Sequence, residues 1–152
     1  MGGSYVRDGR APLPLKESTS RVMSANKGKA TRPELALRRV LRKNGIDGFR
    51  TNWEEAPGRP DIAFPSRRVA IFLNGCFWHR CPYCNPDLPR THKAFWKRKF
   101  LQNTRRDKAK RRALKQAGWQ VLTVWECQLR KSPQRAADRV KALVPERWRL
   151  AR

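Results

Sequence analysis

Four cysteines, Cys76, Cys81, Cys84 and Cys127, constrain the fold of this chain more than any other feature. In an exported protein they would suggest two disulfides. The polar N-terminus, which contains Pro and Gly, does not resemble a secretory signal. The spacing C-x4-C-x2-C followed by a distant cysteine is closer to that of a metal site, and one tetrahedral ion can take all four sulfur ligands. The sequence therefore predicts a metal that cross-links the irregular segment 75–91 to a distant part of the chain.

The charge of the chain limits its partners. The 152 residues include 36 Lys or Arg and 12 Asp or Glu, a formal net charge of +24. Because the basic residues alternate with aromatic ones, we expect a nucleic acid as the partner, and acidic phospholipid is the weaker alternative. No apolar run reaches the roughly 18 residues of a membrane span, so we expect no membrane association.

The hydrophobic pattern predicts a single α/β domain. Helices are expected at 33–44, 92–117 and 133–143, and strands at 49–53, 61–64, 68–74 and 119–125. Elements mixed in this order indicate a short mixed sheet flanked by helices. Thr31 and Glu34 have the spacing of a capping box at the start of the first helix. We expect residues 1–17 to form a flexible arm, 18–144 the domain and 145–152 a tail.

Asp61 is the first candidate catalytic residue. It follows the rigid turn 57–60 and precedes a strand, where many nucleases hold Mg²⁺ against the scissile phosphate. The alternative is an aspartate that only caps the turn. A PD-(D/E)xK nuclease would also have an acid and a lysine on the next strand, but no Asp, Glu or Lys lies between Asp61 and His79. Either Asp61 is structural or a different group completes the site.

His79 is the candidate for that group, because it comes directly after the next predicted strand and the segment 76–78. An imidazole can act as general acid or base in phosphodiester hydrolysis near neutral pH. Two alternatives are a zinc ligand and a hydrogen-bonded core histidine. The only other histidine, His92, begins the long helix and is interpreted as a cap or surface residue.

The long helix carries eleven Lys or Arg and a single acid, Asp107, between His92 and Gly118. A helical wheel places Asn103 and Asp107 on the inward side, where polar groups need partners. Asp107 is therefore either half of a hydrogen-bonded pair that fixes the helix or a site residue. The outward side is predicted to contact phosphates, although a basic face can also be merely solvated. It consists of Lys93, Lys97, Arg98, Arg105, Lys108, Arg111, Arg112 and Lys115.

Three aromatic residues, Phe77, Trp78 and Trp96, lie close to the candidate histidine or at the start of the long helix. Aromatic side chains in basic surroundings can enter a DNA duplex between base pairs. The alternative is that each belongs to the core.

With these motifs in order, the sequence resembles the very short patch repair (Vsr-type) DNA mismatch endonucleases over roughly residues 18–144. The pairing of GCFWH with a downstream VWEC is the most specific part of the resemblance. The matching stretches are KAT at 29–31 with Glu34, PGRPD at 57–61, IFLNGCFWH at 71–79, FW at 95–96, Lys99, Asn103, RD at 106–107, and GW-x-VL-x-VWEC at 118–127.

The resemblance implies a restriction-endonuclease-like (PD-(D/E)xK-type) fold with structural Zn²⁺. It also implies Mg²⁺-dependent nicking of one strand, 5′ to the T of a T·G mismatch formed when 5-methylcytosine deaminates. The partner would be double-stranded DNA with a mismatch, bound by a monomer, with other repair factors following. The location would be the cytoplasm, at the nucleoid of a prokaryotic-type cell.

Residue roles follow from the resemblance position by position. Asp61 would bind Mg²⁺ with the backbone carbonyl of Leu73, His79 would be the general acid/base, and Glu34 would support the site. The zinc ligands would be Cys76, Cys81, Cys84 and Cys127. The DNA-contacting residues would be Met23, Phe77, Trp78, Trp96, Lys99, Asn103 and Asp107.

The sequence also departs from the family pattern. Leu73 stands where some relatives carry Thr, and Asn74 stands where His or Asp can occur, so an acid/base or ligand role at Asn74 is in doubt. Cys81 replaces a histidine ligand of some members, and Cys84 is displaced by one residue. Two alternative functions stay open: a nickase with a different mismatch or restriction-linked target, and a zinc-stapled DNA-binding protein without catalysis.

Overall fold

The computed structural model describes residues 31–144. Its centre is a four-stranded sheet in the order β1-β2-β3-β4. The strands are β1 (Arg50–Thr51), β2 (Ile62–Phe64), β3 (Val69–Asn74) and β4 (Gln120–Trp125). The first three pair antiparallel and β3 pairs parallel to β4, so the predicted short mixed sheet is confirmed. Within residues 31–144, no helix is long and apolar enough to cross a membrane.

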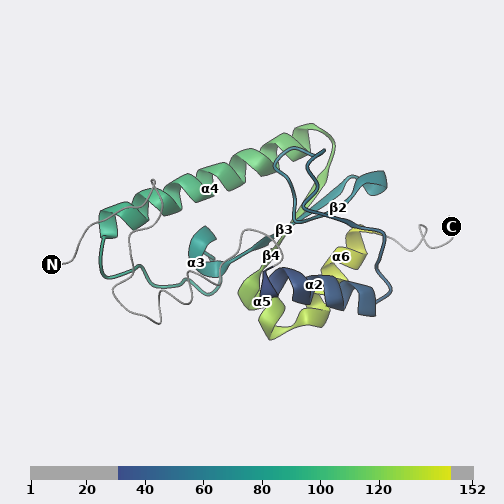
Figure 1. Cartoon of the computed structure of the whole chain (residues 1–152), viewed down its shortest axis with the longest axis horizontal. Helices are drawn as coiled ribbons and strands as arrows, with labels where there is room; N and C mark the ends of the chain where they lie inside the picture. The colour runs from purple at the N-terminus through teal and green to yellow at the C-terminus, as the bar shows by residue number, and fades with distance from the viewer. Residues whose placement is uncertain (1–30, 145–152) are drawn as a thin grey trace.

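Helices cover both faces of the sheet (Figure 1). The long helix α4 (Lys93–Gln116) lies along one side, and α2 (Arg32–Lys43), α5 (Glu126–Lys131) and α6 (Pro133–Leu143) lie on the other. A parallel pair of strands needs a crossover connection, and here the crossover between β3 and β4 contains α4. The ends of the predicted helices and strands agree with the structure to within one or two residues, which leaves β1 with two of its five expected residues.

Successive side chains of β3 point to opposite faces of the sheet and therefore belong to two different hydrophobic clusters. Val69 and Ile71 belong to a large aliphatic cluster with α2, α5 and α6. Ala70 and Phe72 belong to a smaller cluster that includes Leu114 of α4. Because both faces of β3 are covered, its sequence reads as a continuous apolar run.

The start of α2 follows from its local sequence. The Thr31 side chain accepts a hydrogen bond from the Glu34 N–H at 3.4 Å, which is one half of the predicted capping box. Leu37 and Leu41 share one side of the helix and are fully buried. Packing of this side buries Glu34, which is 7% exposed, close enough to Asp61 for its charge to act on that residue.

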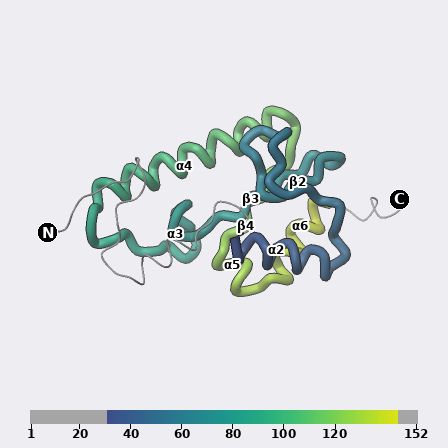
Figure 2. Tube along the Cα trace, viewed as in Figure 1, coloured from purple at the N-terminus to yellow at the C-terminus, as the bar shows by residue number. Residues whose placement is uncertain are grey.

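The segment between β3 and α4 was predicted to be irregular, but it begins with a one-turn helix, α3 (Cys76–His79). From α3 the chain extends away from the sheet to the N-terminal end of α4, and α4 then runs back toward the sheet (Figure 2). Four residues are too few to show helical periodicity. The six-residue helix α5 was not predicted either. The predicted arm 1–17, Met23 and the tail 145–152 lie outside the described residues.

Candidate active site and cysteine cluster

Asp61 lies immediately before β2, at the end of a turn that packs against α4. Gly58 in this turn has φ +75°, and a Cβ added there would lie 2.8 Å from the Cβ of Lys110. Pro60 is fully buried. The turn therefore fixes the Asp61 backbone against two elements, the sheet and α4.

The Asp61 carboxylate reaches across to β3, where its Oδ2 accepts a hydrogen bond from the Leu73 N–H at 2.8 Å. Pairing between β2 and β3 begins only at Ile62 and Ile71, so the Leu73 N–H is beyond the paired residues. The N–H and C=O of one residue in an extended strand point to the same side. The Leu73 carbonyl therefore points to the side of Asp61, as the predicted metal site requires.

The electrostatic surroundings of Asp61 are mixed. Burial raises the pKa of this carboxyl from 3.8 to about 6, opposed by the hydrogen bond from Leu73. The negative charge of Glu34 raises the pKa further, and the positive charges of Lys110 and His79 lower it. Two carboxylates that come from different elements and lie close enough for one charge to act on the other are a suitable environment for a divalent cation.

His79 and Asp107 form a close pair between α3 and α4. The His79 Nδ1 and the Asp107 Oδ2 are 2.6 Å apart, and the two side chains are 30% and 14% exposed. A carboxylate on Nδ1 fixes the ring orientation and leaves Nε2 for another group. The helical wheel predicts that Asp107 faces inward, and the structure pairs it with His79, a partner that the sequence does not identify. The resemblance also predicts Asp107 as a DNA contact.

The aromatic residues of α3 and α4 form a cluster of ring contacts next to His79, in which Phe77 packs edge to face on its neighbours. Phe77 contacts Trp96 and Phe100 with ring centroids 5.5 and 5.2 Å apart. Trp96 and Phe100 are buried, whereas Phe77 and Trp78 are partly exposed. Trp96 thus packs against the two residues of α3, which are more accessible than it is.

Two polar residues of α4 that the resemblance predicts as DNA contacts differ in their surroundings. Asn103 Nδ2 donates a hydrogen bond to the Trp78 carbonyl at 2.9 Å, so this amide holds α3 in place. Lys99 is partly exposed on the same helix. Most of the predicted outward basic residues of α4 are exposed, and a shallow groove near its C-terminal end is lined by Lys108, Arg111, Arg112, Lys115 and Gln116.

The four cysteines come together beside α3. Their sulfur atoms all lie within 4.8 Å of one another, and none of the four forms a disulfide. Cys127 N–H also donates to the Cys76 sulfur at 3.3 Å. Four sulfur donors at this separation fit a tetrahedral ion that favours thiolates. The cluster could hold a metal that joins α3 to the start of α5.

Comparison with known proteins identifies the family to which this chain belongs. Residues 14–85 match the family described as DNA mismatch endonuclease Vsr. The similarity also extends over most of the chain, as individual relatives show. The chain belongs to the Vsr family and is a DNA mismatch or nicking endonuclease.

Three relatives illustrate the likeness. The type II nicking enzyme V.NaeI of Lentzea aerocolonigenes is 41% identical over 122 residues, which are 78% of this chain and 73% of that protein. The type II nicking enzyme V.XorIIP of Xanthomonas oryzae pv. oryzae (strain KACC10331 / KXO85) is 42% identical over 108 residues, 71% and 79% of the two chains. DNA mismatch endonuclease Vsr of Escherichia coli (strain K12) is 37% identical over 115 residues, 76% and 73% of the two chains.

Proposed function

We propose that this protein nicks one strand of duplex DNA 5′ to the T of a T·G mismatch, in a Mg²⁺-dependent reaction that begins very short patch repair. The observation that carries the proposal is the placement of Asp61 on the Leu73 N–H, with the His79–Asp107 pair at the same end of the sheet. A carboxylate for a metal and an imidazole for a proton are the two groups that hydrolysis of a phosphodiester needs.

Asp61, Glu34 and the Leu73 carbonyl are the residues that would hold Mg²⁺. Bound there, Mg²⁺ would polarise the scissile phosphate and activate water. The Leu73 N–H holds one Asp61 oxygen and thereby orients the other. Glu34 is held by Arg38 at 3.5 Å, which limits the motion of the second carboxylate.

His79 would move the proton. Asp107 accepts at Nδ1, so the tautomer with a proton on Nδ1 presents a free Nε2 lone pair to the reacting group. The same carboxylate stabilises the imidazolium that forms when Nε2 takes up a proton. Asp107 is thus a positioning residue for the general acid/base.

DNA would bind along α4 and the aromatic residues. The basic outward side of α4 supplies phosphate contacts, and Phe77 and Trp78 would enter the duplex beside the mismatch. A T·G pair costs less to open than a matched pair, which favours mismatched DNA. Zn²⁺ in the cysteine cluster would keep α3, and with it His79, in position. We further propose a monomer that acts at the nucleoid in the cytoplasm, followed by other repair factors.

The names of two relatives support an alternative target. V.NaeI and V.XorIIP are type II nicking enzymes, so a nickase with a different mismatch or a restriction-linked target is the second candidate. Both candidates use the same catalytic residues and differ only in the DNA that is cut.

A nicking assay on end-labelled duplexes separates the candidates. One set carries T·G in several flanking sequences, a second carries each other mismatch, and a third is the T·A homoduplex, each with Mg²⁺ or EDTA. We expect a Mg²⁺-dependent nick 5′ to the mismatched T and an intact homoduplex. Preferential cutting of another mismatch would favour the second candidate, and cutting of every duplex would refute mismatch specificity.

A further inference from the structure

Arg38 of α2 is a mostly buried cation beside the proposed metal site. Its side chain is 13% exposed, whereas those of Arg59 and Arg130, which also pair with carboxylates, are 44% and 71% exposed. Burying a guanidinium is costly unless its charge and its hydrogen bonds are satisfied. The carboxylate that the structure places beside Arg38 is Glu34, one turn earlier on the same helix.

The pair between Arg38 and Glu34 is incomplete. Arg38 Nη2 donates to Glu34 Oε2 at 3.5 Å, and the buried Nε has no hydrogen-bond partner among residues 31–144. The exposed pair of Arg130 and Glu126 has the same spacing of four residues, and its atoms are 3.0 Å apart. A buried pair offsets its desolvation only with good geometry, often two parallel bonds from the guanidinium. The buried pair is here the looser one, so Arg38 holds Glu34 weakly.

Glu34 also lies near a second charged group, the Asp61 carboxylate. The negative charge of Glu34 raises the pKa of Asp61, and Glu34 is buried, so water screens this interaction poorly. A divalent cation bound by both carboxylates would compensate their charges. Arg38 and such a cation are therefore alternative partners for the same carboxylate.

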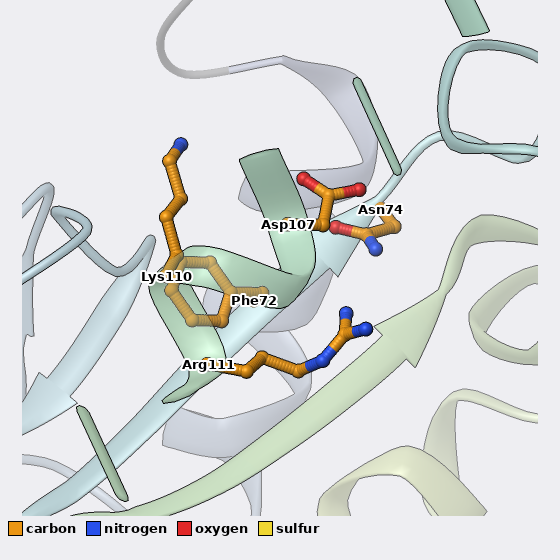
Figure 3. Close-up of a pocket in the computed structure, with 5 residues that line it drawn as sticks. All are labelled: Phe72, Asn74, Asp107, Lys110 and Arg111. Carbon is orange, nitrogen blue, oxygen red and sulfur yellow. The ribbon is translucent and has the colours of Figure 1, made fainter. Parts of the chain in front are cut away.

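The cations of α4 approach the site from the other layer of the sheet. The charge of Lys110 acts on Asp61, and Figure 3 shows that its ammonium points away from Asn74. The residues around the small hollow on this side are Phe72, Asn74, Asp107, Lys110 and Arg111. Arg38, in contrast, reaches Glu34 from within α2.

We propose that Arg38 is a positioning residue that competes with the divalent cation for Glu34, and that it thereby sets the metal concentration at which the active site fills. The inference rests on the proposed function, because it requires a metal at Asp61 and Glu34. In the metal-free protein Glu34 pairs with Arg38, and metal binding weakens that pair. Arg38 acts through Glu34 and does not touch the reacting atoms.

Metal binding to the zinc-loaded protein without DNA tests the competition. Mn²⁺ is the probe, because it favours the same oxygen ligands as Mg²⁺ and its free form is measured by electron paramagnetic resonance. Binding at the proposed site is the component that Asp61→Ala removes. Arg38→Met keeps a long side chain without its charge, and its Mn²⁺ dissociation constant should fall about tenfold. Arg38→Lys should stay within about threefold of the wild type, since a single contact does not need the arginine fork.

Arg39→Met is the matched control, because Arg39 is the next residue of α2 and is exposed. It removes the same charge and should leave the Mn²⁺ dissociation constant within about twofold of the wild type. In a Glu34→Gln background, Arg38→Met should change the constant by less than about threefold, since no carboxylate remains to compete for. In single-turnover nicking, the Mg²⁺ concentration for half-maximal rate should be about tenfold lower in Arg38→Met than in the wild type.

The outcomes separate this proposal from the proposed function. An unchanged or larger Mn²⁺ dissociation constant in Arg38→Met would refute the competition, as would an equal gain in Arg39→Met or in the Glu34→Gln background. A wild type without an Asp61-dependent Mn²⁺ component would refute it as well. The nickase stands in the first cases if the wild type still cuts its duplex. A wild type that cuts no duplex refutes the proposed function, while the Mn²⁺ titration still decides whether Arg38 competes for Glu34.

Discussion

The two ends of the described molecule are stabilised by different interactions. At one end, β2, β3 and β4 pack with α2, α5 and α6 around a continuous aliphatic cluster. At the other end, α3, the connection that follows it and the first turns of α4 bury few residues, mainly Cys76, Cys81, Trp96 and Phe100. Tyr83 and Leu88 in that connection are exposed. The first end is a hydrophobic core, and the second relies on ring contacts and on the cysteine cluster.

This difference matters because the proposed catalytic groups come from both ends. Asp61 and Glu34 are attached to the aliphatic core, whereas His79 belongs to α3. The hydrogen bond between His79 and Asp107 ties α3 to α4. Loss of the metal from the cysteine cluster should therefore displace the His79 imidazole and leave the carboxylates of Asp61 and Glu34 in place. The predictions below test whether the two ends are independent in this way.

The largest effect is expected from Cys84→Ser, which removes one sulfur from the cluster and leaves the aliphatic core intact. The purified wild type should contain about one zinc per chain and the variant almost none. Nicking should fall by about 10²–10⁴-fold, the usual contribution of a general acid/base, because His79 loses its position. Metal analysis, a nicking assay and limited proteolysis within 80–92 measure these effects. Two disulfides and no metal in the wild type would contradict the prediction.

Leu41→Ala should destabilise the aliphatic core and leave the metal content unchanged. Leu41 is fully buried in the aliphatic cluster, so the truncation should lower the free energy of unfolding by about 2–5 kcal/mol. The zinc content of the folded protein should stay at about one per chain. Urea unfolding and metal analysis on the same sample check both. Loss of zinc without loss of stability would show that the two ends are not separate.

Asp61→Asn should stabilise the protein in Mg²⁺-free buffer at pH 7.5. The pKa of Asp61 is about 6 in the folded protein and 3.8 in the reference state, so the folded state binds more protons between these values. Its stability therefore falls as the pH rises through this range. The variant should gain up to about 3 kcal/mol above pH 6. The gain should shrink toward zero as the pH approaches 4. Thermal unfolding at several pH values measures the gain, and Asp87→Asn, which changes an exposed carboxylate, is the control. A gain in stability that does not change with pH would contradict this explanation.

Gly58→Ala tests the contact between the Asp61 turn and α4. Positive φ and the collision with Lys110 should together cost about 1–3 kcal/mol of stability. Gly48→Ala has a similar φ of 74° and serves as the control for the backbone cost alone. Denaturant unfolding should show the greater loss for Gly58→Ala, and its nicking rate should fall because the Asp61 turn shifts. Equal losses would mean that the turn does not depend on Lys110.

The two ends also differ in how well the sequence predicts them. The capping residue Thr31 and the apolar spacing of Leu37 and Leu41 predict α2, because these signals are local. The cysteine spacing predicts a cluster, since one ion constrains all four positions. The strand order and the helix α3 were not predicted, because the first depends on long-range pairing and the second is too short for a periodic pattern.

Side-chain partners were the least predictable part of the site. The inward position of Asp107 was visible on a helical wheel, but its pairing with His79 depends on how α3 meets α4. Lys110 looked like one more residue of a basic helix, and only the folded turn at Gly58 places it beside Asp61. Contacts between residues that are distant in sequence carry no local signal.

The most direct test of the central claim compares binding with nicking in Asp61→Ala, using the T·G duplex with Mg²⁺. We predict that the variant binds the duplex within about threefold of the wild type, because DNA affinity comes mainly from phosphate contacts along α4. Its single-turnover nicking should fall below about one thousandth of the wild-type rate, since the carboxylate that would hold Mg²⁺ is gone. Nicking by Asp61→Ala at the wild-type rate would contradict the assignment of the active site.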